Sequence, residues 1–305
     1  MITTIASQQV LSLRRQRILS VVLVSFIAMT VLAGFIGWSS HNTIIRVYDQ
    51  AVKMLAASGK TAPPNPFGLK PPLSLLSNMA IYIPLIGALL AIVVGHLAMA
   101  EDQANGLGRM IFTRRISRRS YVAGKIVAVA LVLAGMLAVS LAVAVASLVL
   151  VNSTAPTLSE LLRLVGFYAL SWLYLMVFAL IGMVTVLATR RRSLGLLSAL
   201  GVWLIVTFAF PQVTSGLRPT ASLNPINDPV STSQTFFRLT AQARPVSIGE
   251  EYKQAAARIL QTAPGELVSR TAVRALPLLM ALAALAALTV VLVKRHDYAK
   301  ATDGE

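Results

Sequence analysis

The charged side chains best placed to do chemistry gather in one short stretch between two apolar runs of the chain. Glu101 and Asp102 open this stretch, and Arg109, Arg118 and Lys125 follow them. Carboxylates that precede a basic run can form ionic contacts with another protein or with lipid headgroups. These five residues therefore mark a candidate contact site rather than a catalytic one.

The same stretch contains apolar residues at helical spacing, namely Leu107, Met110 and Ile111. This spacing predicts a short interfacial helix within segment 100–121, with its acids near the positive N-terminal end. The alternative is a basic loop that lies against anionic lipid. The residues alone leave both interpretations open.

The rest of the chain offers no catalytic, metal or cofactor site. With no Cys and three scattered His, thiolate metal sites, cysteine nucleophiles and the usual zinc patterns are excluded. Ser58-Gly59-Lys60-Thr61 ends like a phosphate-binding loop, but Met54 stands where the first glycine is needed. His96 is interpreted as a satisfied or snorkelling histidine, with a proton relay as the alternative. We expect no cofactor.

The composition requires a membrane to position these residues. The 305 residues are 56% hydrophobic and 12% charged, and their mean hydropathy is +0.73, which excludes a water-soluble globule. A bilayer core needs roughly 20 apolar residues per helix. Six such runs lie near 18–38, 77–99, 126–151, 164–189, 193–210 and 275–293. We predict an all-α polytopic membrane protein with six transmembrane helices in a single domain, residues 1–305, the first run being a retained helix because it is too long for a signal peptide.

The basic residues predict the orientation of these spans. They concentrate before the first run, in 109–125, in 190–192 and after the last run, all on one side of the membrane. The positive-inside rule places that side, and both termini, in the cytoplasm. These cytoplasmic basic residues account for the net charge of +16. With 7% aromatic residues besides, no nucleic-acid partner is expected.

Three further segments complete the organisation. Residues 1–17 are predicted to form an amphipathic helix along the inner interface, with Ile2, Ala6, Val10 and Leu13 on one face and Gln8, Gln9 and Ser12 elsewhere; a frayed terminus is the alternative. The outer loop 39–76 is proline-rich, which favours extended backbone. The outer loop 211–274 is predicted to contain a short helix from Ile248 to Gln261.

Small residues at four-residue spacing run along the third span, at Ala130, Ala134, Ala138, Ala142 and Ala146. In the fifth span Gly195 and Ala199 repeat this spacing. Small side chains permit close approach of another helix. These stripes predict either a tight bundle or a seam between two copies.

The order of residues from 101 to 125 resembles a known family. Glu101-Asp102, Gly106, the Ser-Arg pair at Arg118 and Gly124-Lys125 at the start of the next span look like the cytoplasmic loop of ABC-2 type permeases, the membrane halves of ATP-binding-cassette exporters. The runs at 83–90, 200–203 and 223–225 look like the permease of the nitrous-oxide-reductase maturation system. The likeness follows nearly the whole chain in order.

This resemblance implies a permease subunit whose segment 100–121 forms a coupling helix on a separate cytoplasmic ABC ATPase. The candidate coupling residues are Glu101, Asp102, Gly106, Arg109, Arg118, Gly124 and Lys125. ATP hydrolysis in that partner would drive export or a conformational signal across the membrane, with metalloenzyme maturation as the implied setting. Other implied partners are a second permease copy (a homodimer) or a sister permease, the lipid bilayer and an accessory protein on the outer face. The implied location is the bacterial inner membrane.

Two other classes remain as alternatives. An ion-coupled secondary transporter usually reveals itself by ionisable residues inside its spans, and the charge-free middles of these spans weigh against it. A membrane anchor or assembly factor without transport would use the polar outer loop as its working part.

Overall fold

The computed structural model describes residues 2–15, 17–61, 71–104, 117–152, 155–189, 191–215, 242, 246–262 and 268–295. These residues form helices and contain no strand. The elements are α1 (Ile2–Arg15), α2 (Arg17–Ala57), η1 (Pro72–Leu76), α3 (Met79–Tyr82), η2 (Ile83–Gly87), α4 (Ala88–Ala104), α6 (Arg118–Asn152), α7 (Leu158–Ala188), α8 (Arg192–Leu204), η3 (Ile205–Ala209), α9 (Phe210–Ser215), α11 (Ile248–Ile259) and α12 (Val268–Arg295). Six helical runs in the described residues are long and apolar enough to cross a membrane. The all-α polytopic fold predicted from the sequence is therefore confirmed.

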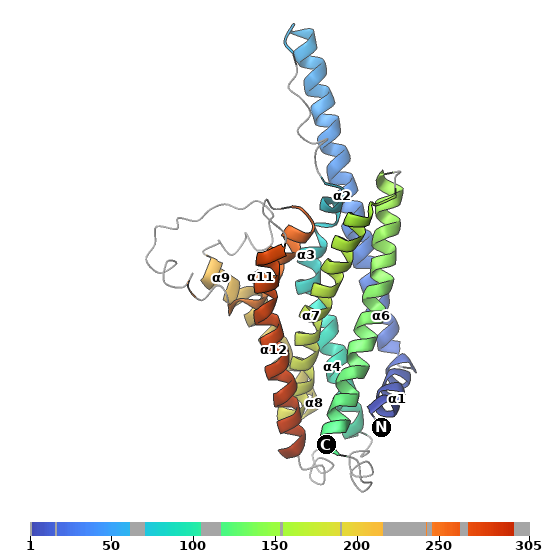
Figure 1. Ribbon diagram of the computed structural model, residues 1–305, viewed down its shortest axis with the longest axis vertical. Helices are drawn as coiled ribbons and strands as arrows, with labels where there is room; N and C mark the ends of the chain where they lie inside the picture. Colours follow the sequence, from blue (N-terminus) through green and yellow to red (C-terminus); the bar gives the residue numbers. More distant parts are fainter. Residues whose placement is uncertain are drawn as a thin grey trace.

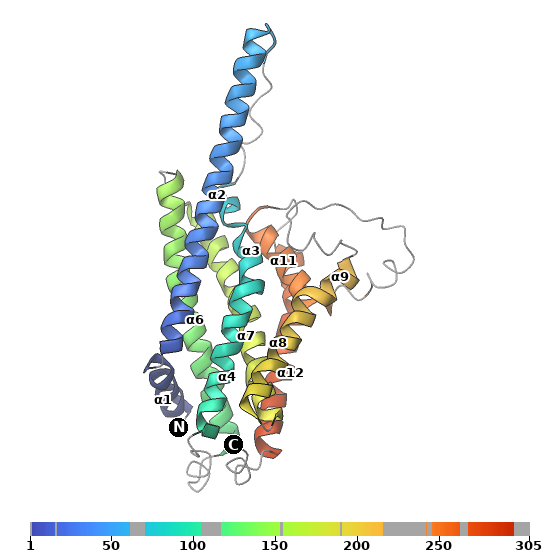
Figure 2. The same cartoon turned by 180° about the vertical axis from the view of Figure 1, so that it is seen from behind.

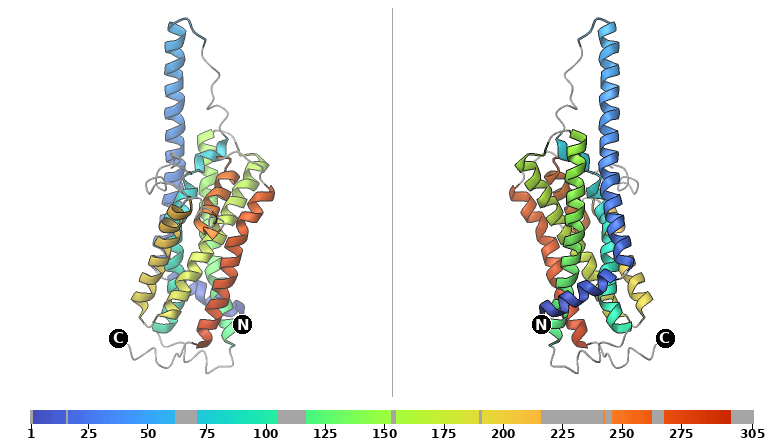
Figure 3. Two further views of the ribbon diagram at one scale, coloured as in Figure 1. Left: turned by 90° about the vertical axis from the view of Figure 1, so that its left-hand side faces the viewer. Right: turned by 90° about the vertical axis from the view of Figure 1, so that its right-hand side faces the viewer.

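The spans stand side by side in one bundle, with a distinct helix near each of its two ends (Figure 1). Helix α1 lies across one end, against the first turns of α6 and close to the last turns of α4, whereas α11 lies toward the other (Figures 1 and 3). The view from behind shows α2 continuing far beyond the bundle on the α11 side (Figure 2). These two ends are called the α1 end and the α11 end.

Helix α7 forms the centre of the bundle. Its most apolar window is 78% buried, against 17% for the last span and 22% for the fifth. Its first turn is closed by a capping box, in which Thr157 and Glu160 satisfy each other's backbone N–H groups. Because α7 is apolar on all sides and surrounded by other spans, it is the rigid axis against which they pack.

The tightest contact in the bundle joins α4 to α7. A Cβ atom added to Gly95 would lie 1.9 Å from the Ala179 carbonyl oxygen, and one added to Gly182 would lie 2.4 Å from that of Ile92. Only glycine permits backbones to come this close, as in small-residue seams of membrane helices. The second and fourth spans are thereby locked together.

The first outer loop differs from the prediction. Helix α2 does not end near Trp38 but continues to Ala57, so the expected extended backbone is wrong for residues 39–57. The reason is local, since this stretch lacks Pro and Gly and holds good helix formers. Gly59, with φ of 72°, ends the helix, and Lys60 N–H donates to the Leu55 carbonyl at 3.0 Å in a Schellman motif. The proline-rich residues 63–66 lie outside the described residues.

The second outer loop contains the short helix that was predicted. Helix α11 runs from Ile248 to Ile259, close to the expected 248–261. Helix α12, which carries the sixth span, begins at Val268, while the apolar span within it begins at Ala275, as predicted. Tyr252 of α11 is fully buried and packs on Tyr174 of α7, with ring centroids 4.5 Å apart.

Two spans contain a π-helical turn. In the second span η2 begins beside Pro84, which has no N–H to give and disrupts regular α-helical bonding. In the fifth span η3 follows Trp203, whose indole N–H donates to the Pro84 carbonyl at 3.0 Å. This bond joins the two irregular turns, a type of feature that is common at functional sites.

The two predicted small-residue stripes have different surroundings. Gly195 and Ala199 are buried, and Gly195 packs against Val186 and Thr189 at the end of α7. On α6, by contrast, Ala134, Ala138, Ala142 and Ala146 are exposed and Ala130 is half-buried. The fifth-span stripe therefore serves packing within the bundle, whereas the α6 stripe faces outward.

Candidate functional site

At the α1 end, a cluster of polar side chains joins α1 to the helix ends that flank segment 105–116. We call it the α1-end cluster, and it consists of Gln9, Ser12, Glu101, Asp102, Tyr121 and Lys125. It joins α1, the last turns of α4 and the first turns of α6. Gly106 and Arg109, also predicted from the sequence, lie outside the described residues.

Helix α1 is brought to this site by a close contact with α6. A Cβ atom on Gly124 would meet the Ile5 side chain at 2.7 Å, so the absence of a side chain at this position lets α1 lie directly on α6. Of the four residues predicted to share one apolar face, Ala6 and Leu13 are buried, Val10 is half-buried and Ile2 is exposed, whereas Gln9, expected elsewhere, is buried. A helix is thus formed at the N-terminus, and its inward face includes a polar residue that the apolar pattern did not reveal.

Lys125 is the centre of the cluster. Its ammonium Nζ lies 2.7 Å from Asp102 Oδ2, donates to the Ala98 carbonyl at 2.8 Å and donates to Gln9 Oε1. These three acceptors match the three N–H bonds of an ammonium group. Removing a buried charge from water is costly and is offset only when its partners are complete, a condition that Lys125 meets.

Asp102 is equally enclosed. Its side chain is 10% exposed, and its Oδ2 also accepts a hydrogen bond from the Tyr121 hydroxyl. Lys125 and Asp102 therefore hold α6 and α4 together from inside the bundle. Neither side chain faces out to meet a partner, although the sequence grouped both with the contact residues.

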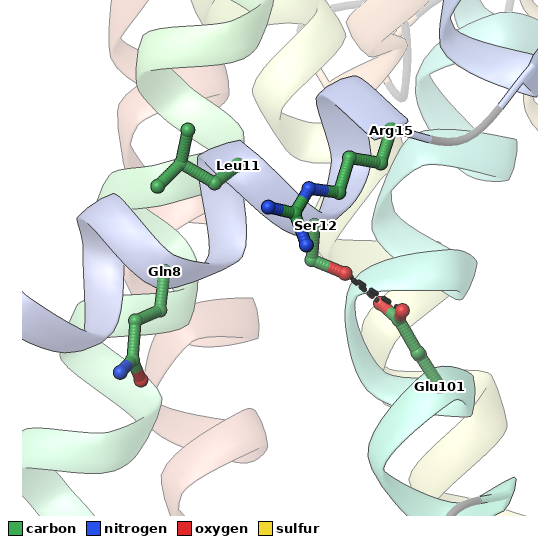
Figure 4. A pocket seen from close by; sticks show the side chains of 5 residues that line it. All are labelled: Gln8, Leu11, Ser12, Arg15 and Glu101. Carbon is green, nitrogen blue, oxygen red and sulfur yellow. Dashed lines mark hydrogen bonds between the residues drawn. The ribbon is translucent and has the colours of Figure 1, made fainter.

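Glu101 is placed differently from its neighbour. It accepts hydrogen bonds from Ser12 Oγ at 2.6 and 2.7 Å to its two carboxylate oxygens. It lines a hollow of ≈ 410 Å³ together with Gln8, Leu11, Ser12 and Arg15 (Figure 4). The Glu101 carboxylate is thus held to α1 by a hydroxyl group.

Arg118 links the same region to the last helix. Its guanidinium donates to the Val293 carbonyl at 3.3 Å and to the Lys294 carbonyl. These carbonyls belong to the last turn of α12, where a cation satisfies otherwise unpaired acceptors and opposes the helix dipole. Arg118 therefore ties the start of α6 to the end of α12.

His96 lies buried in α4 near the same end, with 8% of its surface exposed. Its Nδ1 meets no hydrogen-bond partner among the described residues. Among the described residues, no group of three or more His, Asp or Glu is placed to hold a metal ion.

Sequence reasoning missed Gln9, Ser12 and Tyr121. Tyr121 stands one helical turn before Lys125, and Gln9 and Ser12 are spaced by three residues on α1. Such spacings put side chains on one helix face, which could have indicated that they act together. Nothing in the sequence, however, places α1 against α4 and α6.

The fold and this site define a polytopic helical membrane protein whose charged residues tie helix ends together at one end of the bundle. A family model described as "ABC-2 family transporter protein" matches residues 3–298. The chain therefore belongs to that family. It is therefore a permease component of an ABC transporter, a family that implies an ABC ATPase partner and membrane embedding. No curated protein matches the chain.

Proposed function

We propose that this chain couples ATP hydrolysis in a separate cytoplasmic ABC ATPase to movement of the membrane spans through its α1 end. The observation that carries this proposal is the α1-end cluster, which joins α1 to the end of α4 and the start of α6, on either side of segment 105–116. A push on that segment reaches the end of α4 and the start of α6 together. The driven event is export of a substrate or a conformational signal to a partner on the outer face.

The packing of the spans supports transmission from this end. Helix α4 is locked to the central helix α7 through Gly95 and Gly182, so displacement of its last turn moves the bundle axis rather than one side chain. Arg118 adds α12 to the same unit. Packed helices joined by polar contacts can carry a displacement from one end of a membrane protein to the other.

The charges of the described residues support a cytoplasmic position of the α1 end. Arg15, Arg17, Arg119, Arg191 and Lys294 all belong to helix ends on this side. The positive-inside rule then places both termini in the cytoplasm and α11 on the outer side of a bacterial inner membrane.

The exposed alanine stripe on α6 supports assembly with a second permease. Ala134, Ala138, Ala142 and Ala146 offer a face on which another helix can approach closely. We propose a homodimer, with a sister permease as the alternative occupant. The likeness of the sequence to the permease of nitrous-oxide-reductase maturation supports metalloenzyme maturation as the setting.

Glu101 provides the sharpest test of docking. Asp102→Ala is unsuitable, because it leaves Lys125 buried and unpaired. Glu101→Gln keeps an oxygen that can accept from Ser12 and removes only the charge. We expect the ATPase to co-purify with Glu101→Gln at a yield at least threefold below wild type, and with the control Asp49→Asn, on the exposed part of α2, at wild-type yield. Equal yields for Glu101→Gln and wild type would contradict docking at this hollow.

A further inference from the structure

We propose that three buried hydroxyl groups toward the α11 end form a binding site for a hydroxyl oxygen, supplied by ordered water or by a hydroxyl-bearing solute. They belong to Tyr174 in α7, Thr207 in the π-helical turn η3 and Ser247 at the start of α11. We call them the hydroxyl site. Three elements that are distant in sequence therefore each contribute one group of the same chemistry.

Each of the three hydroxyls is removed from solvent and lacks a partner. Tyr174 is 0%, Thr207 5% and Ser247 1% exposed, and within the part of the chain that the structure describes the oxygen of each meets no hydrogen-bond partner. A buried hydroxyl without a partner destabilises a protein by about 1–3 kcal/mol. Three together would be an unusual loss for one region of a well-packed bundle.

Thr207 departs from how this chain treats its other buried threonines. In regular helix, Thr30, Thr214 and Thr289 each donate to the carbonyl four residues earlier, at 2.7–2.9 Å. Thr207 lies in a π-helical turn instead and makes no such bond. The irregular turn therefore leaves its hydroxyl available to a ligand.

Ser247 and Tyr174 depart from comparable residues in the same way. Ser247 precedes the first turn of α11 but makes no side-chain capping bond, whereas Thr157 caps α7 fully. The Tyr168 hydroxyl pairs with Ser140 at 3.0 Å, whereas that of Tyr174 has no such short hydrogen bond among the described residues. All three hydroxyls thus lack the local partner that their residue types usually find.

The start of α11 lies against Tyr174 and the π-helical turn. A Cβ atom built on Gly249 would lie 3.7 Å from the Tyr174 hydroxyl and 3.5 Å from the carbonyl of Val206, the residue before Thr207. The Tyr174 and Thr207 hydroxyls also lie within reach of each other. Ser247 is the N-cap of α11, two residues before Gly249.

The chemistry of these groups favours a neutral ligand. Each hydroxyl can donate one hydrogen bond and accept others, and an oxygen with the same capacity can satisfy all three. The Glu250 carboxylate of α11 accepts from Thr214 at 3.4 Å and Gln254 at 3.5 Å. Burial raises the pKa of the neighbouring Tyr252, so that side chain also stays neutral. Buried waters typically make about three hydrogen bonds to such groups.

The direction of a stability change tests the site. If the hydroxyls bind an oxygen, Tyr174→Phe, Thr207→Val and Ser247→Ala each lose a hydrogen bond, and the Tm falls by about 2–4 °C per variant. If they bind nothing, each variant removes an unpaired buried group, and the Tm stays equal or rises. Tyr168→Phe, which removes a bonded hydroxyl, is the control and should lower the Tm in every condition.

The solution conditions distinguish water from a solute hydroxyl as the source of the oxygen. The full chain is purified in lauryldimethylamine oxide and phosphate buffer, which add no alcohol groups, and is melted with and without glycerol as the probe. A fall for the variants in buffer alone identifies water as the ligand, and a fall that requires glycerol identifies a solute hydroxyl. Variants that melt at or above wild type in both conditions would overturn the proposal. Thr207→Val, which preserves side-chain shape, carries the test if Tyr174→Phe does not fold.

Discussion

The Lys125 ammonium at the α1 end and three hydroxyls at the α11 end differ in how they are paired within the chain. At the α1 end, Lys125 finds acceptors for all three of its N–H bonds within the chain. At the α11 end, the hydroxyls of Tyr174, Thr207 and Ser247 find none. A buried ammonium needs a charged partner within the chain, whereas buried neutral hydroxyls can be satisfied by a bound oxygen. The Lys125 group is thus closed on itself, whereas the three hydroxyls offer hydrogen bonds to a ligand.

The largest loss of stability is expected from breaking the ion pair between Lys125 and Asp102. Asp102→Ala leaves the Lys125 ammonium buried without its carboxylate and should destabilise the protein by about 3–5 kcal/mol. Thermal unfolding of the detergent-solubilised chain measures this loss. The double variant Asp102→Leu with Lys125→Met replaces the pair by apolar groups and should recover most of it. A double variant as unstable as Asp102→Ala would show that the ion pair is not the source of the effect.

A smaller effect is expected where α1 rests on α6. Gly124→Ala places a methyl group against Ile5 and should destabilise the chain by about 1–3 kcal/mol, with faster hydrogen exchange of the α1 amides. Gly135→Ala, on the same helix with nothing within 4 Å of the added Cβ, is the matched control and should be neutral or stabilising. Equal hydrogen exchange of the α1 amides in both variants would show that the packing of α1 does not depend on Gly124.

At the α11 end a bonded hydroxyl sharpens the comparison with the unpaired ones. Tyr252→Phe removes the 2.9 Å hydrogen bond to Ser171 and should destabilise the chain by about 1 kcal/mol. Hydrogen exchange of α11 is expected to rise while that of α1 stays unchanged. A rise at both helices would mean that the two ends are not independent in stability.

The smallest change in stability is expected at Glu101. Glu101→Gln retains the contact with Ser12 and should alter the free energy of unfolding by no more than about 0.5 kcal/mol. Thermal unfolding beside Asp102→Ala shows the contrast directly, because two adjacent carboxylates are then separated by several kcal/mol. A loss at Glu101 as large as at Asp102 would place both in the structural core.

The sequence allowed the membrane architecture to be predicted, because the length of an apolar run is a local property. Six spans, the α11 helix and the existence of an N-terminal helix all follow from residue patterns. The extension of α2 to Ala57 was missed because prolines further along the loop outweighed good helix formers before them. The exposure of the α6 alanine stripe was left open because small residues suit both packing and assembly.

The site was predictable only in part. Sequence reasoning grouped Glu101 and Asp102 as one contact, yet a helix turns about 100° per residue, so neighbours face different surroundings. Asp102 points inward to Lys125, and Glu101 lines the hollow beside α1. Gln9 and Ser12 became part of the site through tertiary contacts across 116 and 89 residues of chain, respectively, which no local pattern encodes.

ATPase stimulation by Glu101 variants tests the central proposal most directly. The cognate ABC ATPase is assayed alone and with the permease reconstituted in lipid nanodiscs, using wild type, Glu101→Gln and Asp49→Asn. We predict that wild type and Asp49→Asn change the hydrolysis rate of the ATPase equally, and that Glu101→Gln, though folded, leaves it at the rate of the ATPase alone. A full response with Glu101→Gln would contradict coupling through the α1 end.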